Sequence, residues 1–366
     1  MLTGAPEIDD VAALLDADVE GLLPASAMAG AQCRAMAAAR DEGVLEPLEQ
    51  LRPRAVVVVC GDGTSGRAVD LVIALAGPHI DVPLIKCAAV PPWIGPLDVV
   101  VIAGDDAGDP RLADAAARAG RRRAEVVVAG PVEGPLQEAL VGPVVDLSPR
   151  VHVPAAYRFS HYVAALFAVL DALRAVRFEG RHPDLSAMAD ELDSEAAGNH
   201  PGHELFHNAA KELAVRIADR RTVWTGDTAA GMVVAVHASR AIFAGAGVVS
   251  TATDLGEVVA AGTLSAGYGG TMPADYDPIF HDVEIDGPIP REPVRVQVLT
   301  TPDREWLVRR LTASLTDVDV RTSGPAEQST AEPQPRGSGM EDLVPLMILA
   351  LRADMAAAYL RLVGSH

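Results

Sequence analysis

A short glycine-rich stretch is the first part of this sequence whose residue types and spacing could do chemistry. Gly61, Gly63 and Gly66 follow a run of β-branched residues, and Thr64 and Ser65 supply hydroxyl groups between the last two glycines. Glycine permits close backbone approach, and a helix that starts near Thr64 would present free N–H groups above the turn. Such groups favour an anion. The stretch therefore predicts an anion-binding turn.

One interpretation of this turn is a dinucleotide-binding fold. The stretch 61–66 has the GxGxxG spacing directly after a predicted strand. That fold also needs an acidic residue at the end of the next strand, where it binds the ribose hydroxyls. The next predicted strand, 82–85, is followed by Lys86, and Asp81 stands at its beginning instead. The context of the turn therefore disfavours a dinucleotide.

A second motif, His203 to His207, reads HELFH and matches the HExxH pattern of zinc metalloproteases. On a helix it would place both histidines on one face, with Glu204 positioned to activate water. A third ligand is required, but Ala210 and Leu213 occupy the glycine and histidine positions of the metzincin extension. A protease, or adventitious metal binding that also uses His200, is therefore a minor alternative. No cofactor and no resident metal are expected.

The elements that must position these residues alternate between strand and helix. Predicted strands are 54–60, 82–85, 99–103, 126–129 and 143–146, then 222–225, 247–250, 279–285 and 294–299. Helices are predicted between them, near 65–76, 110–119, 135–140, 206–219, 229–244 and 255–261. This alternation predicts doubly wound parallel sheets in a three-layer α/β/α arrangement, with ligands beyond the carboxyl ends of the strands.

The pattern predicts two such units in tandem. Residues 1–176 hold two or three helices, the first unit and a long helix over 155–176. The polar stretch 177–202 is predicted to be a connector. Residues 203–366 form the second unit, which a helix over 340–363 closes. Loops are predicted at 265–277 and, from its proline, serine and glycine content, at 323–339.

Composition narrows the class of protein. The 366 residues suffice for two cores, and the formal charge of −20 opposes binding to nucleic acid or to an anionic membrane. Cys33, Cys60 and Cys87 cannot all pair with one another, which favours reduced thiols. The amino terminus lacks the pattern of a signal peptide, and no apolar run is expected to reach transmembrane length. We therefore expect a cytoplasmic protein without nucleic-acid or membrane partners.

The stretch 60–72, CGDGTSGRAVDLV, resembles the first phosphate loop of bifunctional phosphoglucose/phosphomannose isomerases, which belong to the sugar isomerase (SIS) domain family. The tandem units, the segment 208–220 (NAAKELAVRIADR) and the closing helix are also similar to that family, so the resemblance covers nearly the whole chain. It implies two tandem SIS-type domains, a sugar-phosphate ligand, and a homodimer whose subunits share sites.

The resemblance implies a set of substrate-binding residues in the glycine turn, the second loop and a PRAA-like segment: Gly61, Gly63, Thr64, Ser65, Arg67, Asp105 and Arg158. In the family the second loop, approximately SYSGNT, donates hydroxyl groups. Here the stretch 105–110 reads DDAGDP, and carboxylates accept hydrogen bonds and repel phosphate. In the PRAA-like segment Ala155 stands in the arginine position, and Arg150 or Arg158 could substitute for it. We therefore expect weak affinity for sugar phosphates.

Three residues are candidates for catalysis: Glu257, His281 and Arg361. Glu257 matches the first glutamate of a family segment like NELPExxHNE, but 260–262 reads Ala-Ala-Gly in place of HNE. His281 is the best candidate acid after the predicted loop, and Arg361 stands where a YLKxxL-like ending has lysine. These departures predict a sugar-phosphate-binding protein with weak or lost isomerase activity. The alternative is an active isomerase that interconverts glucose 6-phosphate or mannose 6-phosphate with fructose 6-phosphate.

Overall fold

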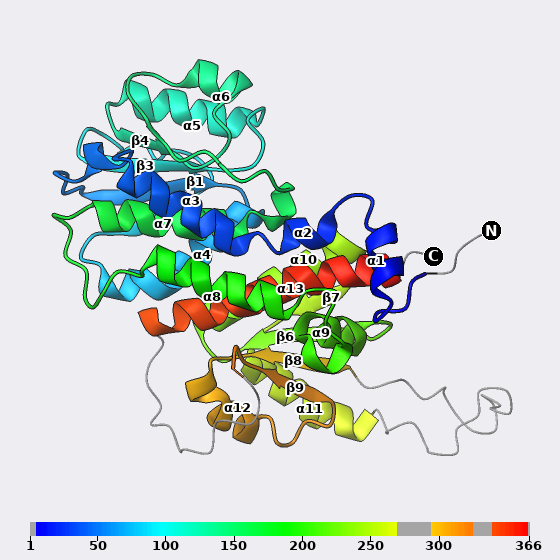
Figure 1. Ribbon diagram of the computed structural model, residues 1–366. Helices are drawn as coiled ribbons and strands as arrows, with labels where there is room; N and C mark the ends of the chain where they lie inside the picture. Colours follow the sequence, from blue (N-terminus) through cyan, green and yellow to red (C-terminus); the bar gives the residue numbers. More distant parts are fainter. Residues whose placement is uncertain (1–4, 269–293, 325–338, 365–366) are drawn as a thin grey trace, which may run out of the picture.

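The computed structural model describes residues 5–268, 294–324 and 339–364. It contains two parallel sheets with helices between them and on their outer faces (Figure 1). The first part of the chain forms α1 (Val11–Ala17), α2 (Leu22–Ser26), α3 (Ala29–Asp41), β1 (Ala55–Cys60), α4 (Thr64–Ala76), β2 (Leu84–Cys87), β3 (Asp98–Ala103), α5 (Pro110–Arg121), β4 (Glu125–Val128), α6 (Gly134–Ala139), β5 (Val145–Asp146) and α7 (Phe159–Ala172).

The second part contributes the elements of the lower half of Figure 1 and the helices at its centre. These are α8 (Leu185–Gly198), α9 (Ala209–Ile217), β6 (Thr222–Gly226), α10 (Ala229–Ala246), β7 (Ser250–Ala252), α11 (Leu255–Tyr268), β8 (Arg295–Leu299), α12 (Glu305–Leu311), β9 (Val318–Arg321) and α13 (Leu343–Val363).

The first sheet has the strand order β2-β1-β3-β4-β5, and all its pairs are parallel. β1 and β3 are buried throughout because both faces of the sheet are covered. Val56 and Val58 contact the core shared with α3, α4 and α7, whereas Val57 and Val59 face α5 and α6. The continuous valine run in the sequence is the signature of this double burial.

The second sheet has the order β7-β6-β8-β9 and is also parallel. One face packs on α10 and its neighbours through Trp224 and Leu299. The other face meets α11 and α12 through Val296 and Val298. The predicted three-layer arrangement with parallel sheets is therefore confirmed for both halves of the chain.

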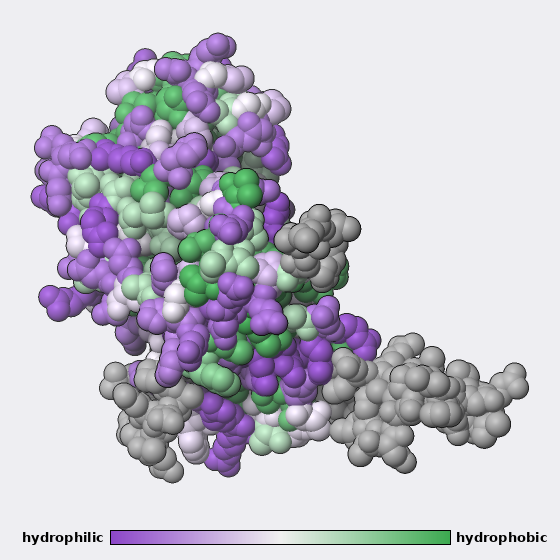
Figure 2. All heavy atoms as spheres, turned by 45° about the vertical axis from the view of Figure 1, so that its right-hand side comes forward, coloured by the Kyte–Doolittle hydropathy of each residue, from purple (hydrophilic) through white to green (hydrophobic). Residues whose placement is uncertain are grey.

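Helix α13 lies at the centre of the molecule and contacts α10, α9, α8 and α2 (Figure 1). It is apolar on every side, which is the pattern of a helix buried all round. By length and composition both α10 and α13 could span a membrane, so the expectation that no apolar run reaches that length was wrong. Most of α13 is buried inside the protein, as is half of α10. On the face seen in Figure 2, apolar side chains are scattered among polar ones.

Several helices and strands begin or end at other residues than predicted, each for a local reason. Gly247 takes a left-handed φ of 70° and ends α10, so β7 begins at Ser250 rather than at 247. The stretch 177–202 contains α8, whose apolar side packs on α3 and α13. The loop expected from residue 265 begins later, since α11 runs to Tyr268. The predicted strand 279–285 lies outside the described residues, and the domain boundaries at 176 and 203 stay predictions.

Candidate functional site

The glycine turn lies at the point where the first sheet reverses its winding. β1 leads into α4 on one face of the sheet, and its neighbour β3 leads into α5 on the other. The two connections therefore diverge and leave a crevice at the carboxyl ends of these strands, which is where ligands bind in such sheets. We call this place the first edge; it is formed by residues 61–67 and 104–109.

The backbone of the turn is held in a close approach that requires glycine. A Cβ atom on Gly66 would lie 2.0 Å from the carbonyl oxygen of Gly61, so the start of α4 presses directly on the end of β1. Gly63 precedes the helix and makes no side-chain capping bond. The first N–H groups of α4 therefore have no capping side chain, and they lie at the positive end of a helix of 13 residues. The close strand–helix approach and the uncapped helix start expected from the glycines are present, and anion binding there stays a prediction.

Behind the turn, a chain of hydrogen bonds connects Arg67 to the second half of the protein. The guanidinium of Arg67 donates to Thr64 Oγ1 at 3.3 Å and to Nδ1 of His237 at 3.4 Å. His237 in turn donates from Nε2 to Asp354 at 3.0 Å. Both His237 and Asp354 are buried, and burial lowers the pKa of Arg67. This network fixes the first turn of α4 against α10 and α13.

Across the crevice, Asp105 is bound by two donors. Tyr162 donates its hydroxyl to Asp105 Oδ1 at 2.8 Å, and Arg158 approaches the same oxygen at 3.3 Å. Burial raises the pKa of the Asp105 carboxyl, and these two partners oppose that shift. Burial and the nearby carboxylate also raise the pKa of Tyr162. Asp105 and Arg158, both predicted from the resemblance, therefore lie in contact.

The other two carboxylates of the second loop serve the loop itself. Asp106 accepts a hydrogen bond from the backbone N–H of Gly108, and Asp109 accepts one from Arg111 at the start of α5. The Arg111 guanidinium is 2.7 Å from Asp109 and lowers the pKa of that carboxyl. Both groups thus stabilise the turn and the helix start, an N-cap role that the residue type predicts.

Lys86 brings to the first edge a positive charge that was not among the predicted site residues. Its ammonium group lies 2.8 Å from Asp70 and 3.8 Å from Asp62. The position of a Cβ on Gly66 would be 3.2 Å from the same nitrogen, so Lys86 stands directly beside the turn. The reason is the register of β2, which pairs Lys86 with Val58 near the carboxyl end of β1.

Of the three candidate catalytic residues, the two that the structure describes do not lie at the first edge. Glu257 is exposed in the first turn of α11 and accepts a hydrogen bond from Thr253, at the end of β7 in the second sheet. Arg361 lies 2.8 Å from Glu20, about 10 Å along α13 from Asp354 by the rise of a helix. His281 lies outside the described residues. The catalytic roles of all three stay predictions.

The HExxH motif does not lie on one α-helix. Leu205–His207 is a 3₁₀ helix, and α9 begins only at Ala209 because Asn208 caps it by accepting from the N–H of Lys211. Among the residues that the structure describes, no group of three or more His, Cys, Asp and Glu side chains is arranged to hold a metal ion. The geometry that a zinc protease would need is therefore missing from the motif.

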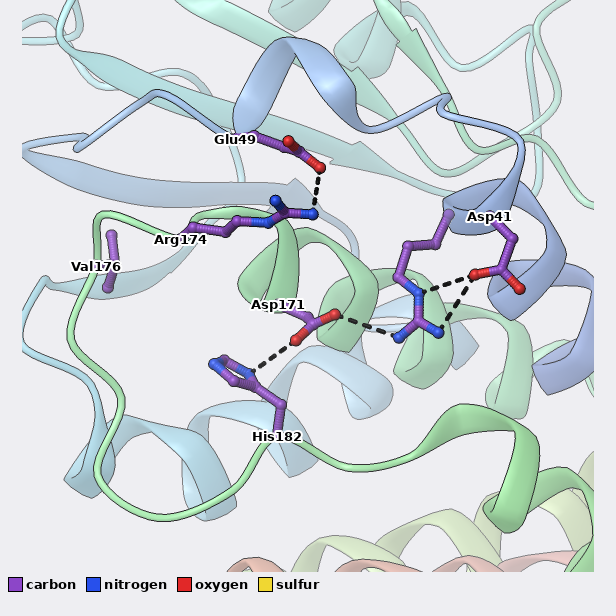
Figure 3. A pocket seen from close by; sticks show the side chains of 7 residues that line it. Asp41, Glu49, Asp171, Arg174, Val176 and His182 are labelled. Carbon is purple, nitrogen blue, oxygen red and sulfur yellow. Dashed lines mark hydrogen bonds and ion pairs between the residues drawn. The ribbon is translucent and has the colours of Figure 1, made fainter.

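A polar pocket of 530 Å³ lies away from the first edge (Figure 3). Its walls come from the ends of α3 and α7 and from the segment that leads into β1. Arg40 and His182 both approach Asp171, at 3.3 and 3.9 Å, while Arg174 pairs with Glu49 at 2.6 Å. Because these charges neutralise one another, the pocket has no cation left over to hold an anion.

No family model and no curated protein matches this chain. Solved structures do. A Bacillus subtilis protein provisionally assigned as a phosphosugar isomerase shares 17% identity at a TM-score of 0.59, covering 93% of this chain and 95% of its own. For a Clostridium difficile protein with the same provisional assignment, the values are 10% and 0.61, with 93% of each chain covered.

The C-terminal domain of glucosamine-fructose-6-phosphate aminotransferase from Francisella tularensis also matches, at 10% identity and a TM-score of 0.54, over 94% of this chain and 95% of that one. This chain has the sugar isomerase fold. The predicted fold class, two tandem SIS-type units, is confirmed, and at these identities the likeness is one of fold.

Sequence reasoning missed several side chains that complete the first edge: Lys86, Tyr162, His237 and Asp354. For Lys86 a signal existed, since a lysine at the end of the strand after the glycine turn is placed beside that turn by parallel pairing. His237 is 170 positions from Arg67, so no local sequence pattern predicts their contact. Its partner Asp354 lies on α13, a mainly apolar helix in which no motif marks that carboxylate.

Proposed function

We propose that this chain binds a sugar phosphate at the first edge and has weak or no isomerase activity. The observation that carries the proposal is the uncapped start of α4, whose N–H groups open into the crevice between β1 and β3. Such groups stabilise a phosphate without any side chain. The hydroxyls of Thr64 and Ser65 add donors, and the predicted set Gly61, Gly63, Arg67, Asp105 and Arg158 surrounds the same crevice.

Electrostatics at this edge supports modest affinity. Lys86, Arg67 and Arg158 are cations, but each is already engaged by another group of the protein. Asp62 lies in the turn itself and Asp105 lies in the facing loop, and the charges of both carboxylates oppose binding. Two unit charges about 4 Å apart interact by roughly 4 kcal/mol at the effective dielectric near a protein surface, so one carboxylate can offset a helix terminus.

Titration calorimetry with glucose 6-phosphate, fructose 6-phosphate and mannose 6-phosphate tests the proposal. Lys86→Met and Arg158→Met together should weaken binding by about tenfold or more, as expected for two lost charge-assisted hydrogen bonds. Arg174→Met is the matched control, since that arginine pairs with Glu49 in the pocket of Figure 3. Absence of heat with all three sugar phosphates would overturn the proposal.

The second candidate function is an active aldose–ketose isomerase that interconverts glucose 6-phosphate or mannose 6-phosphate with fructose 6-phosphate. The observation in its favour is Asp105, a half-buried carboxyl whose pKa is raised by burial and which contacts Tyr162. A raised carboxyl pKa suits proton transfer near neutral pH. A coupled assay decides: turnover that Asp105→Asn removes and Glu257→Gln leaves intact would assign the proton transfer to the first edge, whereas the converse would assign it to Glu257.

We also propose, from the resemblance, that the chain is a cytoplasmic homodimer. Leu15, Val19 and Phe243 are exposed apolar side chains around the ends of α1, α10 and α13, where a second pocket of 610 Å³ opens. Light scattering at micromolar concentration tests the dimer. A monomer would exclude any site that two subunits share.

A further inference from the structure

The second sheet carries a turn that repeats the glycine turn of the first. Residues 226–231 read GDTAAG and residues 61–66 read GDGTSG, and each segment links a central strand to the helix that follows it. A Cβ on Gly226 would lie 2.2 Å from the carbonyl carbon of Gly231. The end of β6 and the start of α10 therefore press together as the end of β1 and the start of α4 do.

This turn also lies at a reversal of winding. β6 leads into α10 on one face, and its neighbour β8 leads into α12 on the other. The register pairs Gly226 with Leu299, and the carbonyl oxygen of Leu299 would be 3.2 Å from a Cβ on Gly231. The residues that follow Leu299 therefore lie beside the turn. We call this place the second edge; it is formed by residues 225–231 and 300–304.

Three threonine hydroxyls at the second edge have no hydrogen-bond partner among the described residues: Thr225, Thr300 and Thr301. Their side chains are buried, with exposed fractions of 0%, 1% and 5%. Thr225 pairs with Val298 and shares its face of the sheet, and alternation along β8 turns Thr300 to that face as well. Thr301, one position further along the chain, is turned to the opposite face, on which α10 lies. Buried hydroxyls are normally bonded, so three with no partner among the described residues, near the carboxyl ends of two paired strands, indicate a missing partner.

The second edge contains two carboxylates, Asp227 and Asp303, and one guanidinium, Arg304, so an anion would be held there by neutral donors and not by net charge. Asp227 is paired with Arg304, and Glu257 accepts a hydrogen bond from Thr253 on the adjoining strand end. Thr228 caps α10 by accepting from the N–H of Gly231. The N–H groups of Ala229 and Ala230 lie at the positive end of this helix of 18 residues, and Ala229 is exposed to solvent.

We propose that the second edge is a further anion site, which binds a phosphate monoester through the hydroxyls of Thr225, Thr300 and Thr301 and the first N–H groups of α10. Hydroxyls can donate to phosphate oxygens, whereas the Asp105 carboxylate at the first edge cannot. The ligand enters at the exposed start of α10. This site is independent of the function proposed for the first edge.

The test uses the paired substitution Thr300→Val and Thr301→Val, which preserves side-chain shape and removes both hydroxyls. Probes are inorganic phosphate and glucose 6-phosphate, with chloride at equal ionic strength as the reference. Titrations are run in a protein that carries Lys86→Met and Arg158→Met. In this background the first edge contributes little to the measured heat, whether or not it binds sugar phosphate in the parent. Thr312→Val is the matched control, because that buried hydroxyl is satisfied by Val308 at 2.9 Å.

Binding in this background is expected, and the threonine pair should weaken it by about tenfold or more. If glucose 6-phosphate binds more tightly than inorganic phosphate, the ligand is an ester; equal affinity identifies free phosphate and overturns the monoester assignment. Without ligand, the threonine pair should unfold at the same or a higher temperature than its parent, since no bond is lost, while Thr312→Val should unfold lower. Unchanged phosphate affinity in the threonine pair, or loss of stability equal to that of Thr312→Val, would refute the site.

Discussion

The two edges of this protein share a backbone design and differ in what their side chains offer. Both have a strand, a glycine turn with the same spacing and a helix, at the point where a parallel sheet reverses its winding. The first edge has an uncapped helix and a loop with carboxylates that are all bound within the protein. The second edge has a capped helix and a loop whose threonine hydroxyls have no hydrogen-bond partner in the part of the chain that the structure describes.

This difference teaches that the glycine pattern alone does not define a phosphate site. Glycines set how closely strand and helix approach, which is a matter of backbone geometry. Whether anion binding is favourable depends on the hydrogen-bond donors and charges that the neighbouring strand brings to the crevice. At the first edge that strand is β3 with Asp105, and at the second it is β8 with Thr300.

The largest effect is expected behind the first edge, where Asp354 anchors the network that ends at Thr64. Asp354→Ala leaves the buried Nε2–H of His237 without its acceptor and removes a carboxylate that compensates the charge of Arg67, so it should lower the free energy of unfolding by about 3 kcal/mol. Urea denaturation measures this. Arg361→Ala, seven residues along the same helix at an exposed ion pair, should cost under about 1 kcal/mol. Equal losses in the two variants would show that the buried network stabilises no more than a surface pair.

The next effect concerns the pH dependence of stability and His161, which precedes Tyr162 on α7. Burial lowers the pKa of His161 to about 4 from an ordinary 6.5, and its Nε2–H donates to the carbonyl of Ala129 at 2.7 Å. Below pH 6.5 the unfolded chain takes up a proton that the folded chain refuses, so the free energy of unfolding should fall by up to about 3 kcal/mol between pH 6.5 and 4. Above pH 6.5 the contribution of His161 to the free energy of unfolding should not change with pH.

His161→Gln keeps a donor for Ala129 and removes the titration. The free energies of unfolding of the two proteins, measured from denaturant curves, should therefore be similar at pH 7, and that of the parent should fall below that of His161→Gln as the pH falls toward 4. The same dependence on pH in both proteins across that range would mean that His161 is protonated in the folded state as readily as in the unfolded one.

A smaller effect on stability is expected from Gly→Ala substitutions, and the two turns differ in which glycine tolerates a Cβ atom. At the first edge Gly66→Ala should cost about 2 kcal/mol, because its Cβ would overlap the Gly61 oxygen, while Gly63→Ala meets nothing within 4 Å. At the second edge Gly226→Ala should cost more than Gly231→Ala, whose nearest neighbour would be 3.2 Å away. Thermal unfolding of the four variants gives the order, and reversal within either pair contradicts the predicted packing.

The smallest effect tests the helix cap. Thr228→Ala removes the acceptor for the N–H of Gly231 and should destabilise the protein by about 1 kcal/mol. At the first edge the corresponding position is Gly63, which makes no such bond, so Gly63→Ala should change stability far less. Urea midpoints of the two variants provide the comparison. If they agree, capping does not distinguish the two helix starts.

Much of the fold could be predicted because its signals are local. The valine run of β1 is apolar at every position since both faces of the sheet are covered, and the turn glycines follow at once. The errors were local too. The HExxH spacing suggested a helix, but the cap at Asn208 starts α9 after the motif. A strand was predicted to begin at Gly247, but this residue ends α10, and β7 begins at Ser250.

The candidate site could be predicted only in part, because its charges are balanced by residues far away in sequence. Asp105 looked like a source of repulsion, and its partner Tyr162, 57 positions later, gave no sign in any motif. The unbonded hydroxyls at the second edge were also invisible. Whether Thr300 is satisfied depends on what surrounds it after folding, which residue type and spacing do not specify.

The place of α13 in chain order has a consequence for how the protein is made. This helix contacts α2, α8, α9 and α10, yet it follows all of them along the chain. Until it leaves the ribosome, the apolar faces that it later covers have nothing in this chain to cover them. Because these contacts join distant parts of the sequence, loop closure makes their formation slow. We expect the nascent chain to depend on chaperones until α13 is released, and deletion of this helix to yield aggregates instead of two folded halves.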